Sequence, residues 1–336
     1  MKHAIRCALL LLLSITLGCR VTDLNLFGPV GPPPAGSLDV EVVRDVAYRG
    51  EPKADPLRHR LDVFEPKGKK DCPVVLLVHG GAWIMGDNRC CGLYSTVGHF
   101  LASQGIVAVL PNYRLSPGVK HPHHIQDVAR ALAWTRDNIA RYGGDPKRIF
   151  LVGHSAGGHL VSLLATDESY LKAEGMKAAD LKGVVSVSGV YRIPHGDQKF
   201  ALGGSTELSM RWDRVYPLIG DSPLGKGNDS GKGLPGNLNV FGPAFGNDDK
   251  VRDDASPINH VRRDLPPFLI LSAEKDLPTL PGMADEFHEA LKKEGCDVKF
   301  QRIERRNHNS IIFSATKPDD PTAKAVLDFI KQHDKR

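Results

Sequence analysis

Short apolar runs that alternate with longer amphipathic stretches constrain the fold of this 336-residue chain more than any other feature. Nearly continuous apolar strands separated by helices are typical of a parallel sheet that is covered on both faces. The pattern therefore predicts an α/β fold with a mostly parallel central sheet of about eight strands and helices on both faces. We expect strands at 60–64, 74–79, 106–110, 148–152, 183–188, 268–272 and 298–303, and helices near 92–103, 124–141, 156–166, 281–294 and 321–333.

Two segments depart from this alternation. An apolar run near 40–46 precedes the run at 60–64 with no helical pattern between them, which predicts an antiparallel hairpin at the edge of the sheet. Residues 203–246 hold ten glycines and four prolines in 44 residues and show no apolar period. A patternless segment of this length between two strands of one sheet is typical of an insertion, and we expect it to be lid-like.

The first 40 residues are predicted to precede the folded domain. Lys2 and Arg6 are followed by an apolar stretch, residues 8–18, which is too short to span a bilayer but is typical of a secretory signal. Gly18-Cys19 resembles a bacterial lipobox, although Thr16 stands where leucine is preferred. We expect a signal peptide at 1–18, a Pro/Gly-rich tether at 19–40 and a catalytic domain at 41–336. The chain would then be exported, either anchored in a membrane through lipidated Cys19 or released to the periplasm or the medium.

Charge and residue content argue against several classes of partner. The formal net charge of +5 is small and the two signs are interleaved, so we expect no nucleic-acid binding. His121, His123 and His124 are clustered, but Pro122 interrupts them and no further ligand spacing accompanies them, so we expect no metal site. Oligomeric state is not encoded in any pattern that we find.

The strongest local motif lies at 148–160, where a buried strand enters a helical pattern through Gly153-His154-Ser155-Ala156-Gly157. This Gly-x-Ser-x-Gly context is that of a nucleophile elbow, in which a strained turn exposes the serine. We expect glycine at 153 and 157 because side chains there would collide where the strand and the helix pack closely. Ser155 is therefore the predicted nucleophile.

A second apolar strand ends in His79-Gly80-Gly81-Ala82-Trp83. Such a turn leaves backbone N–H groups free to face a developing oxyanion, and the N–H of Ala156 completes the expected oxyanion hole. A tight turn after a strand is the alternative interpretation of an isolated His-Gly-Gly. Its occurrence upstream of the elbow favours the oxyanion hole.

Acyl transfer by serine needs an acid and a base in the chain order Ser, Asp or Glu, His. The acid should follow a late strand, and Asp276 lies just past the end of the expected strand at 268–272. Glu274 is the weaker alternative. Asp285, inside a helical pattern, and Asp297, at the start of a strand, fit less well.

The base should follow the next strand, and His308 comes directly after the expected strand at 298–303. His288 and His333 lie in helical patterns and have structural interpretations. Three more histidines flank the predicted site and are expected to orient backbone or line the pocket rather than transfer protons: His79, His154 and His159.

With these motifs together, the chain resembles the α/β-hydrolase superfamily. Within it, the resemblance is to the branch of kynurenine formamidase-like proteins, hormone-sensitive-lipase-like carboxylesterases and bacterial esterases of the bifunctional feruloyl and acetylxylan type. Trp83 replaces the third glycine of the lipase-like His-Gly-Gly-Gly and favours the formamidase and feruloyl-esterase side. Further stretches that carry the resemblance are Asn112–Pro117, Asp127–Trp134, Tyr142–Pro146, Ala255–Ile258 and Asn307–Ile312.

The resemblance implies Ser155 as nucleophile, Asp276 and His308 as its partners, and the N–H groups of Gly81, Ala82 and Ala156 as the oxyanion hole. It implies a serine hydrolase of carboxylic esters that needs no cofactor. We expect short acyl groups, acetyl or feruloyl, carried by small molecules or by carbohydrate. The insertion 203–246 is longer than this branch suggests, which leaves the substrate pocket undetermined.

Two other functions stay open at this point. An arylformamidase fits the resemblance but fits an exported protein less well, because tryptophan catabolism is cytoplasmic. A non-catalytic binding module on the same fold is the alternative of a different class. It is disfavoured because Ser155, Asp276 and His308 are all present.

Overall fold

The computed structural model describes residues 37–52, 54–89, 92–196, 200–201, 237–238 and 240–334. The expected signal peptide, Cys19 and most of the expected tether lie outside the described residues, as does most of the insertion predicted at 203–246. Within the described part of the chain, no helix is both long enough and apolar enough to cross a membrane.

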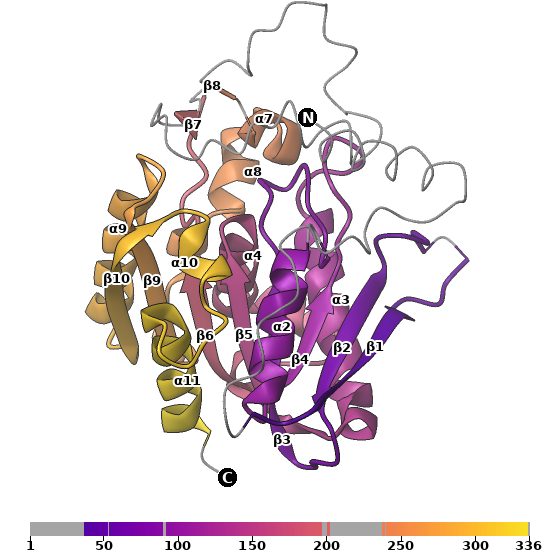
Figure 1. Ribbon diagram of the computed structural model, residues 1–336. Coiled ribbons are helices and arrows are strands. Elements are labelled where there is room, and N and C mark those ends of the chain that lie inside the picture. The colour runs from indigo at the N-terminus through magenta and orange to yellow at the C-terminus, as the bar shows by residue number, and fades with distance from the viewer. Residues whose placement is uncertain are drawn as a thin grey trace, which may run out of the picture.

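An eight-stranded sheet forms the centre of the molecule (Figure 1). Its spatial order is β1-β2-β4-β3-β5-β6-β9-β10. Strands β3 to β10 of this sheet run parallel, whereas β2 pairs antiparallel with both β1 and β4. The strands are β1 (Val40–Ala47), β2 (Arg60–Pro66), β3 (Cys72–Val78), β4 (Val107–Pro111), β5 (Gly144–His154), β6 (Leu181–Val187), β9 (Phe268–Lys275) and β10 (Val298–Asn307).

Helices cover both faces of the sheet (Figure 1). They are α2 (Leu93–Ser103), α3 (His123–Asn138), α4 (Ala156–Thr166), α5 (Glu168–Ala173), α7 (Phe241–Phe245), α8 (Asp249–Asp254), α9 (Leu280–Lys293), α10 (Ser310–Phe313) and α11 (Pro321–His333). Three short 3₁₀ turns, Ile139–Tyr142, Ala178–Asp180 and Pro257–His260, and a two-stranded ribbon of β7 (Phe200–Ala201) and β8 (Asn237–Leu238) complete the described elements.

The strand β3 shows why both faces are covered. Its side chains alternate between two buried clusters: Val74 and Leu76 pack with residues of α3, α4 and α9, whereas Val75 and Leu77 pack with residues of α2 and α11. Because successive side chains of a strand point to opposite faces, a strand that is apolar at every position needs a helical layer on each side. The predicted fold class, an α/β fold with a mostly parallel sheet, is confirmed.

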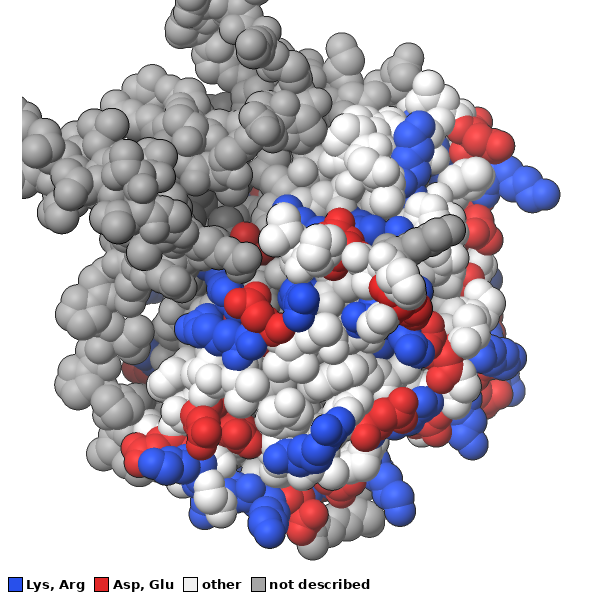
Figure 2. Space-filling model, turned by 90° about the vertical axis from the view of Figure 1, so that its right-hand side faces the viewer, with Lys and Arg blue, Asp and Glu red and all other residues white. Residues whose placement is uncertain are grey.

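The predicted hairpin lies at the sheet edge, since β1 is an outermost strand and pairs only with β2 among the described strands. On the face shown in Figure 2, Lys and Arg side chains are interspersed with Asp and Glu, so neither sign forms a large continuous patch there. The short segments that follow β3, β5, β9 and β10 gather at one edge of the sheet, because these strands run parallel. The residues predicted to carry chemistry lie in these segments.

Candidate active site

Ser155 occupies a strained turn between β5 and α4. Its backbone has φ 56° and ψ −120°, a conformation that a non-glycine residue adopts only where the surrounding structure imposes it. The Ser155 N–H donates to the carbonyl of Val187 at the end of β6 at 2.9 Å, and the Ser155 carbonyl accepts from His159 at 3.0 Å. The turn is thus tied to the neighbouring strand and to the helix that follows.

The two flanking glycines are required by close backbone contacts. A Cβ at Gly153 would lie 2.2 Å from the carbonyl oxygen of Gly157, and a Cβ at Gly157 would lie 2.1 Å from the carbonyl oxygen of Val78. Both separations are well below any van der Waals contact, and both involve backbone atoms that cannot rotate away. The physical reason expected for the glycines therefore holds in the structure.

The structure brings Ser155, His308 and Asp276 into one hydrogen-bonded line. His308 Nδ1 lies 2.7 Å from Asp276 Oδ1, and His308 Nε2 lies 2.9 Å from Ser155 Oγ. Because a carboxylate only accepts, Nδ1 donates to it, which leaves Nε2 to accept the hydroxyl hydrogen of Ser155. This is the geometry in which a histidine can take a proton from a serine.

Asp276 is held from several sides. Besides His308, its carboxylate accepts hydrogen bonds from the Ser188 hydroxyl, from the Ala273 N–H at 3.1 Å and from the Leu277 N–H at 2.9 Å. Burial alone would raise the pKa of Asp276, but the hydrogen bonds from His308, Ser188 and Leu277 outweigh it, and the pKa lies below the ordinary value. The side chain of Asp276 is fully buried, so the carboxylate is a fixed, ionised partner for the imidazole.

The other carboxylates that the sequence allowed lie elsewhere. Glu274 is exposed and accepts a hydrogen bond from the N–H of Arg305 at 2.6 Å. Asp285 is exposed and pairs with Arg302. Asp297 is exposed and lies near His333, at the opposite end of β10 from His308.

The turn His79–Trp83 lies against the elbow. A Cβ at Gly80 would lie 3.0 Å from the Cβ of Ser155 and 2.9 Å from the carbonyl oxygen of His154. Gly81, Ala82 and Trp83 all have positive φ, of 120°, 52° and 60°. Among the described residues, the backbone hydrogen bonds assign no acceptor to the N–H of Gly81 or Ala82, the two residues that directly follow Gly80.

Side-chain and backbone groups of the segment after β4 hold this turn in place. The His79 ring stacks on Tyr113, with centroids 4.3 Å apart, and the Tyr113 hydroxyl donates to the His79 carbonyl at 3.1 Å. The Ser116 N–H donates to the Trp83 carbonyl at 2.8 Å. The segment that follows β4 therefore supports the turn from end to end.

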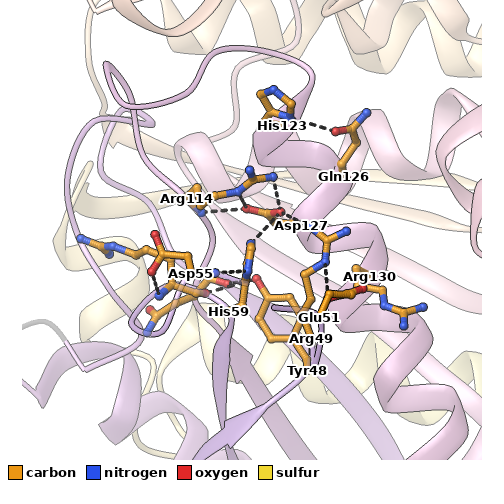
Figure 3. A network of polar contacts seen from close by, with 12 residues as sticks. Tyr48, Arg49, Glu51, Asp55, His59, Arg114, His123, Gln126, Asp127 and Arg130 are labelled. Carbon is orange, nitrogen blue, oxygen red and sulfur yellow. Dashed lines mark hydrogen bonds and ion pairs between the residues drawn. The ribbon is translucent and has the colours of Figure 1, made fainter. Parts of the chain in front are cut away.

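That segment is itself anchored by the buried carboxylate of Asp127 in α3 (Figure 3). The Arg114 guanidinium donates to both oxygens of Asp127 at 2.8 Å, the Arg114 N–H donates at 3.0 Å, and His59 Nε2 lies 3.2 Å away. Burial raises the pKa of Asp127, but the hydrogen bonds from His59 and Arg114 outweigh it and lower the pKa to about 2. Arg114 and Asp127 thus form a bidentate ion pair of high geometric specificity.

The three flanking histidines are buried and each contacts a backbone carbonyl. His79 Nδ1 lies 2.7 Å from Gly80 O, His154 Nε2 lies 2.8 Å from His308 O, and His159 Nε2 lies 2.7 Å from Ala255 O. Desolvation lowers the pKa of His79 to about 4 and those of His154 and His159 to about 3, so all three rings are neutral. His159 also accepts the indole hydrogen of Trp83 at 3.2 Å.

Two residues of the site were not predicted. Ser188, which donates to Asp276, and Tyr94, which accepts from the Gly80 N–H at 2.8 Å, belong to no motif. Ser188 carries only a weak sequence signal, namely its position directly after the buried strand β6. Tyr94 carries no sequence signal, because a tyrosine in a half-buried helix is common.

One cluster among the described residues consists of residue types that can bind a metal ion, and it does not include Ser155. The side chains of Asp167, Asp254 and His260 place one ligand atom each within 4.8 Å of one another. His121, from the predicted histidine cluster, lies 3.6 Å from Asp254. Asp254 is exposed and Asp167 is partly exposed, and such surface groups are common without a metal.

Comparison with known proteins agrees with the geometry. The family model BD-FAE matches residues 61–211. The chain is similar to esterase LipC of Mycobacterium tuberculosis, with 29% identity over 81% of this chain and 62% of the relative. It covers 46% and 55% of two further relatives from that organism, so the chain spans about half the length of the curated relatives it matches.

Solved structures share the fold. A crystal structure of esterase B from Lactobacillus rhamnosus aligns over 99% of this chain and 96% of its own, with a TM-score of 0.67 and 19% identity. A truncated carbohydrate esterase from gut microbiota aligns over 90% and 99%, with a TM-score of 0.66 and 19% identity. The arrangement of the central sheet is thus common to a group of esterases.

Proposed function

We propose that this chain belongs to the α/β-hydrolase superfamily and is a serine hydrolase of carboxylic esters that works through Ser155, His308 and Asp276. One observation carries the proposal. The hydrogen-bonded line from Asp276 through His308 to Ser155 ends at a strained elbow, and Gly80, which directly precedes the positive-φ residues Gly81 and Ala82, lies against that elbow. A nucleophile, its base, the orienting acid and oxyanion donors are thereby within reach of one carbonyl group.

The proposed cycle begins with proton transfer from Ser155 Oγ to His308 Nε2 as the oxygen attacks the ester carbonyl carbon. The carbonyl oxygen becomes an oxyanion, which the N–H groups of Gly81, Ala82 and Ala156 stabilise. The tetrahedral intermediate collapses, the alkoxide leaves with the proton from His308, and an acyl-Ser155 ester remains. Water, deprotonated by His308, repeats the attack and releases the carboxylic acid, which restores Ser155. His308 carries the proton in both halves of this cycle.

For the substrate we propose a short acyl ester, with acetyl or feruloyl groups on carbohydrate as the specific class. The BD-FAE match and the structural likeness to a carbohydrate esterase support this class. An exported enzyme would meet polysaccharide esters outside the cytoplasm. The amide N-formylkynurenine is the competing substrate that the sequence resemblance left open.

A substrate panel tests this proposal. We expect the mature chain to turn over p-nitrophenyl acetate, acetylated xylan and methyl ferulate, and to hydrolyse N-formylkynurenine with a lower kcat/KM than the best ester. Product release would be followed by absorbance or by chromatography of free acetate and ferulate. A kcat/KM for N-formylkynurenine well above that of every ester would replace the ester assignment with an arylformamidase.

We also propose that the chain is exported and lipidated on Cys19. The support is the basic and apolar pattern of residues 1–18 and the Gly18-Cys19 pair. We expect a chain expressed in bacteria to incorporate an alkyne-tagged palmitate and to be recovered with membranes. Cys19→Ala should lose the label. Labelling that persists in this variant would show that Cys19 is not the lipidated residue.

A further inference from the structure

Four residues far apart in the sequence form one buried hydrogen-bonded chain around Ser155. The Gly80 N–H lies 2.8 Å from the Tyr94 hydroxyl oxygen, which lies 2.9 Å from His154 Nδ1. His154 Nε2 lies 2.8 Å from the backbone carbonyl oxygen of His308. The chain therefore links the oxyanion turn, the strand end before the nucleophile and the loop of the predicted base.

The direction of each hydrogen bond follows from the groups involved. A carbonyl oxygen only accepts, so His154 Nε2 carries the hydrogen and donates it to His308. In a neutral imidazole, Nδ1 is then the acceptor and receives the hydroxyl hydrogen of Tyr94. The Tyr94 oxygen in turn accepts from the Gly80 N–H. All three hydrogen bonds are satisfied by a single tautomer of His154.

The surroundings keep this tautomer in place. His154 is only 3% exposed, and the ring of Phe313 in α10 packs edge-on against Tyr94 at 5.2 Å and against His154 at 5.8 Å. Burial and the nearby His308 hold the pKa of His154 at about 3, so the ring does not take up a second proton at working pH. The ring centroids of His154 and His308 are 4.9 Å apart.

We propose that His154 and Tyr94 form a positioning unit that sets the distance between the Ser155 hydroxyl, the imidazole of His308 and the oxyanion turn. This inference rests on the proposed function, because it concerns the same reaction. His154 does not touch the reacting atoms; it acts through the His308 carbonyl on one side and through Tyr94 and Gly80 on the other. Small displacements matter at such a site, since a shift of about 1 Å can lower a rate about 10²-fold.

Two substitutions of His154 separate its two hydrogen bonds. The amide nitrogen of glutamine reaches the position of the imidazole Nε2, so His154→Gln keeps a donor for the His308 carbonyl. The amide oxygen of asparagine reaches only the position of Nδ1, so His154→Asn keeps the acceptor for Tyr94 but loses the contact with His308. Both variants bury the same amide group at residue 154, so they differ mainly in which of the two hydrogen bonds the amide can make.

We expect His154→Asn to lower kcat for p-nitrophenyl acetate by about 30-fold to 100-fold with KM within about threefold of wild type. His154→Gln should recover most of that loss and stay within about tenfold of wild type. Tyr94→Phe, which removes the link to Gly80, should lower kcat about tenfold at nearly unchanged KM. The matched control is Tyr170→Phe, since Tyr170 contacts His121 at 3.3 Å in a similar pair away from Ser155 and its loss should leave kcat unchanged.

Thermal unfolding of each variant distinguishes positioning from a general structural role. Equal losses of kcat in His154→Asn and His154→Gln that follow the loss of folded protein would overturn the inference, as would a wild-type kcat in His154→Asn. If neither His154 variant folds, the Tyr94→Phe variant tests the positioning unit instead. An unchanged kcat in Tyr94→Phe then overturns the inference. Ser155→Ala is assayed alongside: activity that survives in it contradicts the proposed function itself, whereas an inactive Ser155→Ala with fully active His154→Asn contradicts only the positioning unit.

Discussion

Replacing Ser155 with alanine is expected to lower kcat for p-nitrophenyl acetate by a factor on the order of 10⁴ to 10⁶. Alanine keeps the Cβ but removes the oxygen that His308 Nε2 contacts at 2.9 Å, so no acyl-enzyme can form. The turn should stay folded, because its hydrogen bonds to Val187 and His159 are made by backbone groups. Steady-state kinetics and thermal unfolding measured on the same sample check both statements.

The matched control for this variant is Ser162→Ala. Ser162 is buried within α4, and its hydroxyl donates to the Gly158 carbonyl at 2.7 Å without contacting His308. Its loss should lower stability by about 1 kcal/mol and leave kcat close to wild type. A Ser155→Ala protein that is folded and retains more than a small percentage of wild-type kcat would remove Ser155 from the mechanism.

Replacing Asp276 with asparagine is expected to lower kcat about 10⁴-fold. The carboxylate only accepts, which forces His308 to carry its hydrogen on Nδ1 and to present a free Nε2 to Ser155. An asparagine amide can donate to Nδ1 instead, which favours the tautomer that has its hydrogen on Nε2 and cannot take the serine proton. The test measures kcat at neutral pH, and KM and the unfolding temperature are measured on the same variant.

Two control substitutions test the choice of the acid. Asp285→Asn removes an exposed carboxylate paired with Arg302, and Glu274→Gln removes an exposed carboxylate that accepts from the Arg305 N–H. Both variants should keep kcat within about twofold of wild type, because His308 contacts Asp276 and neither of these two carboxylates, and the loss of a surface pair lowers stability little. Full activity in Asp276→Asn together with inactive Glu274→Gln would reassign the acid to the alternative that the sequence had left open.

Much of the fold could be predicted because the buried strands are apolar at nearly every position. The exact ends of the strands could not be predicted in the same way. The strand predicted at 148–152 begins at Gly144, which pairs with Cys72 of the neighbouring strand β3. Its first residues could not be predicted, because residues 145–147 are not apolar. Helices α5 and α8 were not predicted, since six residues are too few to show a period, although the Asp167 and Asp248 side chains cap them.

The candidate site was likewise predictable only in part from the sequence. The elbow and the oxyanion turn are each contiguous in sequence, so their residue types were visible together. The choice of Asp276 over Glu274 depends on which carboxylate turns toward His308, and only the structure shows that. Ser188 and Tyr94 bond to partners 88 and 60 residues away in the chain, and such contacts leave no local pattern.

The crowding of backbones around Ser155 also bears on how such an enzyme could be re-engineered. Gly80, Gly153 and Gly157 each stand so close to a neighbouring main chain that one added methyl group would collide with it. Random libraries that diversify these positions would therefore consist mostly of misfolded variants, whatever substrate is screened. Directed evolution toward a new acyl or alcohol group would gain more from leaving the elbow untouched and varying side chains that approach the serine from outside it.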